Sequence, residues 1–168
     1  MLIIKLKLYL LKHFYYLIIM ENICDKLTIN PDIHEVYGFL ILSTQKYLIG
    51  TFFKGKKEIL FKSDINLKGY RGRGGASAIR FKRIIEERYS KGFKTIEENM
   101  KNFFIKNNLS NISGLIIGGD IKVIKKYLSY KRNNELINLN EYLCTLIETI
   151  NDGELGFEEA IKLSMLEN

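Results

Sequence analysis

Short apolar runs and tight turns predict β structure in the first half of the chain. Residues Val36–Leu42 and Tyr47–Phe53 are apolar runs of strand length, separated by the short turn Ser43–Lys46. A further turn at Gly55–Lys57 precedes a third apolar run, which begins at Glu58. Strands with such short connections usually pair with their neighbours. We therefore predict a three-stranded antiparallel meander.

A helical period replaces this pattern at Ser77. Apolar residues then recur at steps of three and four, as expected for one face of a helix; they are Phe81, Ile84, Ile85, Tyr89, Phe93, Ile96, Met100 and Phe103. A continuous helix from Ser77 to Ile105 would be about 40 Å long at 1.5 Å per residue. Gly92 is a candidate kink within it. Residues Lys62–Gly75 lack any period and predict an exposed loop, which this helix would hold away from the domain body.

The remaining pattern alternates strand and helix. The predicted elements are a strand at Ser113–Asp120, a helix at Ile121–Leu128, a strand at Tyr142–Glu148 and, after Asn151–Gly153, a helix at Phe157–Leu166. A meander followed by such an alternation predicts an α/β fold, with a mixed sheet and helices packed on it. Gly118–Gly119 follows a strand, but no phosphate-loop lysine or dinucleotide fingerprint accompanies it. We interpret it as a turn that begins a helix.

The first 35 residues predict an arm or extension that precedes a domain at residues 36–168. Met1–Met20 is apolar, but its longest unbroken run, Phe14–Met20, has seven residues, whereas a membrane span needs about 20. No small-residue cleavage site follows, as a signal peptide would require. The alternation at Ile4–Leu8 favours a strand or an extended arm, and a start at Met20 is also open.

The composition is that of a folded domain without a metal or cofactor site. The chain has 168 residues, of which 46% are apolar, enough for one domain with a real core. Two cysteines and two histidines, widely separated, give no metal spacing and no disulfide framework. We therefore expect no cofactor and a reducing, cytoplasmic location.

The net charge of +7 is unevenly distributed. Five of the six arginines fall between Arg71 and Arg88, and residues 54–94 hold 13 basic and 4 acidic residues. By sequence the basic charge forms one patch, which indicates a nucleic acid or another polyanion as partner. Within this patch, Arg71 and Arg73 alternate with three glycines. Glycine lets a backbone approach another surface closely, and the arginine fork suits phosphate.

The segment Gly72–Phe81 resembles the GRGGQSALRF signature of eukaryotic and archaeal class-1 peptide-chain release factors. Tyr37–Leu42 with Ile49–Thr51 resembles the first strands of the family's middle domain. Gly114–Gly119 is similar to its GLILAG segment, and Gly153–Phe157 to its GENGF segment. The order and spacing of these segments agree from about Val36 to Leu166, so the resemblance implies the fold of that middle domain.

The resemblance also implies a partner and a site. In this family the middle domain reaches the peptidyl-transferase centre of the large ribosomal subunit, where its Gly-Gly-Gln tip promotes hydrolysis of peptidyl-tRNA. By resemblance, the residues expected to bind ribosomal RNA are Lys68, Arg71, Gly72, Arg73, Gly74, Gly75, Ala76, Ser77, Arg80, Lys82 and Arg83. Neighbouring ribosomal proteins would be further partners. We expect a monomer on the ribosome, with no small-molecule substrate and no membrane contact.

Two departures from the family pattern shape the predicted function. Ala76 occupies the glutamine position, and a methyl group cannot hydrogen-bond a water. From its length and the extent of the resemblance, we also expect the protein to have neither the family's codon-reading domain nor its GTPase-docking domain. We therefore predict a non-hydrolytic protein that plugs the peptidyl-transferase centre, as a dormancy or hibernation factor does, with no catalytic residue.

Other interpretations stay open. One is a codon-independent peptidyl-tRNA hydrolase for stalled ribosomes, which would use the backbone N–H of Ala76. Another is an RNA-binding module away from the ribosome, or a degenerate gene product. An engineered alanine at this position is a further explanation.

Overall fold

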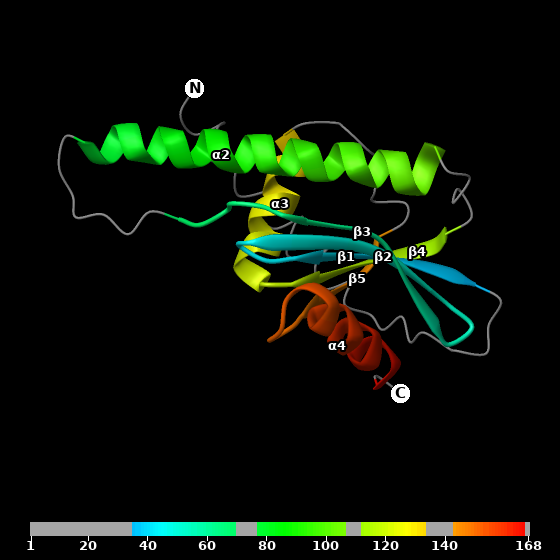
Figure 1. The fold of residues 1–168 in the computed structure, drawn as a ribbon. Helices are drawn as coiled ribbons and strands as arrows, with labels where there is room; N and C mark the ends of the chain where they lie inside the picture. Colours follow the sequence, from blue (N-terminus) through cyan, green and yellow to red (C-terminus); the bar gives the residue numbers. More distant parts are fainter. Residues whose placement is uncertain (1–34, 70–76, 107–111, 134–142, 167–168) are drawn as a thin grey trace, which may run out of the picture.

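A five-stranded mixed sheet forms the centre of the computed structural model, which describes residues 35–69, 77–106, 112–133 and 143–166. The strands are β1 (Val36–Leu42), β2 (Lys46–Phe53), β3 (Lys56–Asp64), β4 (Ile112–Gly119) and β5 (Leu143–Glu148). The helices are α2 (Ser77–Met100), α3 (Ile121–Asn133) and α4 (Gly153–Leu166). The strand order is β3-β2-β1-β4-β5 (Figure 1). This confirms the predicted α/β fold with a mixed sheet, while residues 1–34 of the predicted arm at 1–35 lie outside the described residues.

The antiparallel meander is formed by β1, β2 and β3, as predicted. Lys54 and Gly55 have φ angles of 47° and 75° and form the whole β2–β3 turn. Two residues with positive φ match the twist of the flanking strands. The strand β3 therefore begins at Lys56, two residues earlier than predicted, and continues to Asp64. The prediction of a loop from Lys62 was wrong at this end, because pairing with β2 outweighs the polar composition.

The strands β4 and β5 extend the sheet in parallel. β4 pairs with β1, and β5 pairs with β4. Parallel neighbours need a crossover connection, usually a helix, and α3 lies in the connection between β4 and β5. The helix α3 continues to Asn133, five residues beyond its predicted end.

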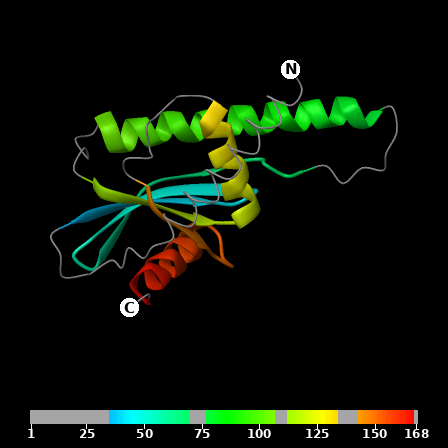
Figure 2. The same cartoon turned by 180° about the vertical axis from the view of Figure 1, so that it is seen from behind.

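Helices cover both faces of the sheet, so the fold has two hydrophobic clusters. Leu40 and Leu42 of β1 lie in the cluster beneath α2 and α3. Phe39 and Ile41 point the other way and pack with Phe157 of α4. Figures 1 and 2 show α2 and α3 on one side of the sheet and α4 on the other. Because both faces are buried, the central strand reads as an unbroken apolar run.

The helix α2 is regular for 24 residues and then changes geometry. Lys101–Lys106 form a π-helical turn, so the predicted α-helix to Ile105 was wrong beyond Met100. The helix shows no kink at Gly92 (Figure 1). A Cβ added there would lie 2.9 Å from Leu67 Cδ2, so Gly92 is instead a place where the loop after β3 packs closely against the helix.

The last helix begins earlier than its apolar period indicates. α4 begins at Gly153, four residues before the predicted start at Phe157. The backbone N–H of Gly156 donates to the Asp152 carbonyl at 3.2 Å, which forms the first helical turn. The carboxylate of Glu159 accepts hydrogen bonds from the N–H groups of Ile150 and Asn151, both at 3.0 Å.

Candidate nucleic-acid interface

The predicted RNA-binding residues flank the beginning of α2 in the sequence, and the structure describes part of the set. Lys68 is exposed in the loop after β3, and Arg80, Lys82 and Arg83 are exposed on the first turns of α2. Ser77 is the first residue of the helix, and its side chain is outside the described residues. The predicted contacts at residues 71–76, Arg71 through Ala76, also lie outside the described residues.

The N-terminal half of α2 projects beyond the sheet (Figures 1 and 2). Side chains that would be buried on a covered helix are therefore exposed: 80% for Ile79, 38% for Phe81 and 37% for Ile84. Arginine and lysine side chains lie among them. A surface that mixes cations with an aromatic ring suits RNA, because phosphates bind the cations and bases stack on aromatic rings.

The charged side chains of this half remain accessible. Lys82 lies 4.0 Å from the carboxylate of Glu86, and Arg83 lies 3.6 Å from that of Glu87. Pairs of this kind, between neighbours on an exposed helix, contribute little to stability. A phosphate can therefore displace the carboxylate at small cost. Within the described residues, Arg80 is in no ion pair.

The C-terminal half of α2 is fixed to the body by aromatic packing. Phe93 is 1% exposed, and its ring centroid lies 5.4 Å from that of Tyr127 and 5.5 Å from those of Tyr89 and Tyr130. The Tyr127 hydroxyl donates to the carboxylate of Glu97, and both side chains are buried. The projecting half of the helix is therefore held by a rigid, well-packed half.

A second set of basic residues lies on α3, and the sequence interpretation missed it. The helix holds five basic residues and no acidic residue. Outside residues 54–94 the basic and acidic residues nearly cancel, and this small net charge hides the local excess on α3. The signal that identifies it is local: Lys122, Lys125 and Lys126 follow helical spacing and are all exposed. The predicted single basic patch is therefore incomplete.

The turn between β4 and α3 begins a helix, as interpreted from the sequence. Gly119 has a φ of 125°, and a Cβ there would lie 1.9 Å from the Leu42 carbonyl oxygen. Asp120 Oδ1 accepts a hydrogen bond from the N–H of Lys122 at 2.8 Å and caps the helix. A carboxylate thus occupies the place where a phosphate would bind.

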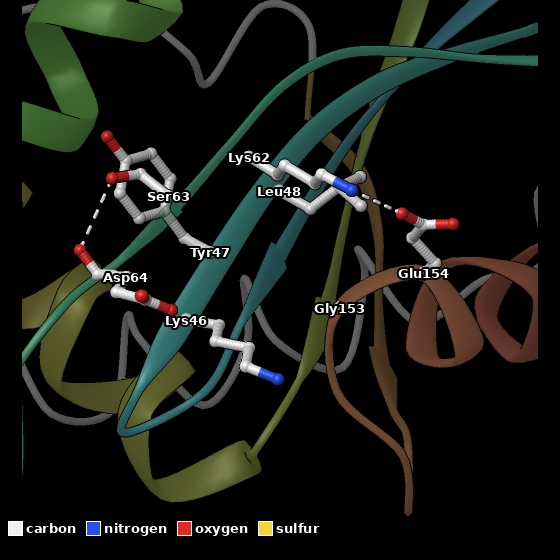
Figure 3. Close-up of a pocket in the computed structure, with 8 residues that line it drawn as sticks. All are labelled: Lys46, Tyr47, Leu48, Lys62, Ser63, Asp64, Gly153 and Glu154. Carbon is white, nitrogen blue, oxygen red and sulfur yellow. Dashed lines mark hydrogen bonds and ion pairs between the residues drawn. The ribbon is translucent and has the colours of Figure 1, made fainter.

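A shallow hollow lies between β2, β3 and the beginning of α4 (Figure 3). Its volume is about 390 Å³. Its lining residues are Lys46, Tyr47, Leu48, Lys62, Ser63, Asp64, Gly153 and Glu154. Lys62 Nζ lies 2.7 Å from Glu154 Oε1, and this hydrogen bond and charge lower the pKa of the Glu154 carboxyl. The two charges satisfy each other, so the hollow offers no unpaired group at this point for a ligand.

Among the described side chains, no three His, Cys, Asp or Glu residues lie together as metal ligands. None of the described helices is long and apolar enough to cross a membrane.

Comparison with known proteins identifies relatives of this domain. The family model described as eRF1 domain 2 matches residues 36–167. Eukaryotic peptide chain release factor subunit 1 of Loxodes striatus is 34% identical over 141 residues, which cover 79% of this chain and 30% of that protein. Its counterpart from Didinium nasutum is 30% identical over 133 residues, covering 78% of this chain and 30% of that protein.

A solved structure shares the fold. The archaeal translation termination factor aRF1 gives a TM-score of 0.58 at 17% identity, covering 78% of this chain and 34% of that one. The chain thus spans about a third or less of the length of these relatives.

Proposed function

Since the chain belongs to the eRF1 domain 2 family, as its motifs indicate, we propose that it binds the large ribosomal subunit and inserts its tip into the peptidyl-transferase centre. The observation that carries this proposal is the projecting half of α2, which presents Arg80, Lys82 and Arg83 beside the glycine-rich segment. Ribosomal RNA and the neighbouring ribosomal proteins are the proposed partners. Binding there would take place in the cytoplasm, with the protein as a monomer.

The tip is proposed to occupy the centre without hydrolysing peptidyl-tRNA. The related signature has glutamine where this chain has Ala76. A glutamine amide both donates and accepts hydrogen bonds, whereas a methyl group does neither. The backbone of Gly74 and Gly75 still allows close approach. A tip with this chemistry fills the site and excludes other ligands, so the protein would act as a translation-silencing dormancy factor.

Electrostatic contacts should dominate the affinity. Each phosphate neutralised by a lysine or arginine lowers the slope of log K against log salt by about 0.7 to 0.9. Arg80, Lys82 and Arg83 alone would therefore contribute a slope of about −2. Binding should be tight at low salt and should weaken steeply as salt is added.

Co-sedimentation with purified large subunits over a range of salt concentrations tests the binding proposal. Arg80→Glu should release the protein at a lower salt concentration than wild type. Lys162→Glu is the matched control, because Lys162 is also exposed and lies on α4, across the sheet. If wild type fails to co-sediment at low salt, or if both variants weaken binding equally, the proposal is wrong.

Peptide release from ribosomes loaded with peptidyl-tRNA tests the absence of hydrolysis. Wild type should bind and release no peptide, and Ala76→Gln should gain release because it restores the amide of the family signature. Release by wild type at a rate comparable to Ala76→Gln would instead support the alternative, a codon-independent peptidyl-tRNA hydrolase acting on stalled ribosomes.

A further inference from the structure

The outer face of α3 carries charge of a single sign. Counted from the buried Tyr127, the side chains of Val123 and Ile124 lie on the sheet side, and both are buried. Lys122, Lys125 and Lys126 fall on the opposite side at steps of three and one, and all are exposed. Exposed helix faces commonly mix both signs. The helix as a whole has five basic residues in 13 and no acidic residue, and three of the five lie on this face.

The lysines of this face are available to a partner. The ion pairs between described residues join lysines and arginines elsewhere, on β3 and α2. None of them involves Lys122 or Lys125. No described carboxylate pairs with these lysines, so a polyanion can bind them with release of counterions.

The basic face of α3 is joined to α2. Lys126 Nζ lies 3.0 Å from the Tyr89 hydroxyl and 4.2 Å from the centroid of its ring. Tyr89 is half-buried near the middle of α2, two turns after Lys82. Both helices lie on the same side of the sheet (Figure 2). This contact therefore places Lys126 beside the middle of α2, at the residue that follows Arg88.

We propose that Lys122, Lys125 and Lys126 form a second RNA-binding surface, which binds the phosphate backbone of ribosomal RNA on the side of the sheet that carries α2. This inference rests on the proposed ribosomal function. The expected partner is RNA and not an acidic protein, because the face contains only flexible point charges and no apolar anchor. Protein interfaces have apolar cores that are depleted of lysine, whereas phosphate contacts need only the charge.

The test uses a triple variant, Lys122→Gln, Lys125→Gln and Lys126→Gln, and two probes. The probes are purified large ribosomal subunits and a 20-base-pair RNA hairpin. On both, the dissociation constant should rise on the order of tenfold, and the slope of log K against log salt should become less negative by about 2. A triple lysine-to-arginine variant should retain binding, since the charge is kept. The double variant Lys122→Gln and Lys125→Gln leaves the Lys126–Tyr89 contact intact and should show an intermediate loss.

The control removes two lysines outside residues 54–94, by Lys46→Gln and Lys162→Gln, and is matched to the double variant; both residues are exposed, on β2 and α4. If the control loses as much binding as the double variant, or if the triple variant equals wild type on both probes, the surface on α3 is refuted. Wild type that binds the hairpin but not the subunit refutes the proposed function alone. Wild type that binds neither probe refutes both.

Discussion

Replacing Tyr127 by phenylalanine tests how α2 is fastened to the body. The side chain is fully buried, and its hydroxyl donates to the Glu97 carboxylate, which is 1% exposed. Tyr127→Phe removes the donor and keeps the ring that packs on Phe93. A buried acceptor that loses its donor costs about 1–3 kcal/mol. For a domain of this size, each kcal/mol corresponds to about 4 °C in melting temperature.

The same variant has a signature at high pH. Burial and, next, the neighbouring Glu97 raise the pKa of Tyr127 well above 10.0. The unfolded chain releases the phenolic proton near pH 10, whereas the folded chain keeps it. The stabilisation is therefore complete below pH 10 and is lost as the pH rises toward the folded pKa. Wild type should lose up to about 1.4 kcal/mol per pH unit from this group, and Tyr127→Phe should lose none of it.

Urea unfolding followed by far-UV circular dichroism, at pH 7 to 11, measures both effects. The midpoint of Tyr127→Phe should lie below that of wild type at pH 7, and the two midpoints should converge above pH 10. Titration of lysines and other tyrosines is common to both proteins and cancels in the difference. Equal midpoints at pH 7, or a constant difference up to pH 11, would refute the role given to this hydrogen bond.

Two further predictions concern the stability of glycine variants and the pKa of Glu154. Gly119→Ala should lower the free energy of unfolding by about 3 kcal/mol or more, because its positive φ and the clash of a Cβ with the Leu42 backbone cannot be relieved. Gly92→Ala should change it by no more than about 1 kcal/mol, since alanine's higher helix propensity offsets a contact with the flexible ends of side chains. Thermal melts compare them, and equal losses would contradict this explanation. Lys62→Gln should raise the pKa of Glu154 toward 4.5, because Lys62 is the main cause of its lowered value. The pair stabilises the fold above pH 4.5, and this stabilisation is lost as the pH falls through the folded pKa of Glu154. NMR titration of the carboxyl measures its pKa, and the same pKa in Lys62→Gln and wild type would show that the pair does not form.

The elements that the sequence predicts well are those whose pattern is local. Val36–Leu42 is a strand because its apolar run is covered on both faces, and the start of α2 at Ser77 follows from the change of period. The end of β3 was missed because Lys62–Asp64 is polar and becomes strand only by pairing with β2. The π-helical turn at Lys101–Lys106 likewise has no signal in an apolar period that continues through it.

The candidate interface was predicted in part for a related reason. The arginines near the tip stand out in sequence because they are clustered, and the structure places Arg80 and Arg83 on the projecting helix. The lysines of α3 do not stand out when charge is summed over long segments, because acidic residues elsewhere cancel them. Only the fold shows that Lys126 meets Tyr89 of α2 and so lies beside the predicted patch.

The packing of the C-terminal half of α2 against the body determines how precisely the tip is positioned. From Gly92, where the loop after β3 packs against the helix, to Ser77 is about 22 Å along the axis at 1.5 Å per residue. A tilt of the helix by about 10° at Gly92 would therefore move the beginning of the helix by about 4 Å. Such a displacement exceeds a hydrogen-bond length, so a tip that enters a narrow RNA site needs a stiff base. The aromatic cluster around Phe93 and the buried pair Glu97–Tyr127 supply that base. Substitutions in this cluster or in the pair should consequently weaken ribosome binding, although these residues contact no RNA. The loss of affinity should increase with the mobility that the substitution gives to α2.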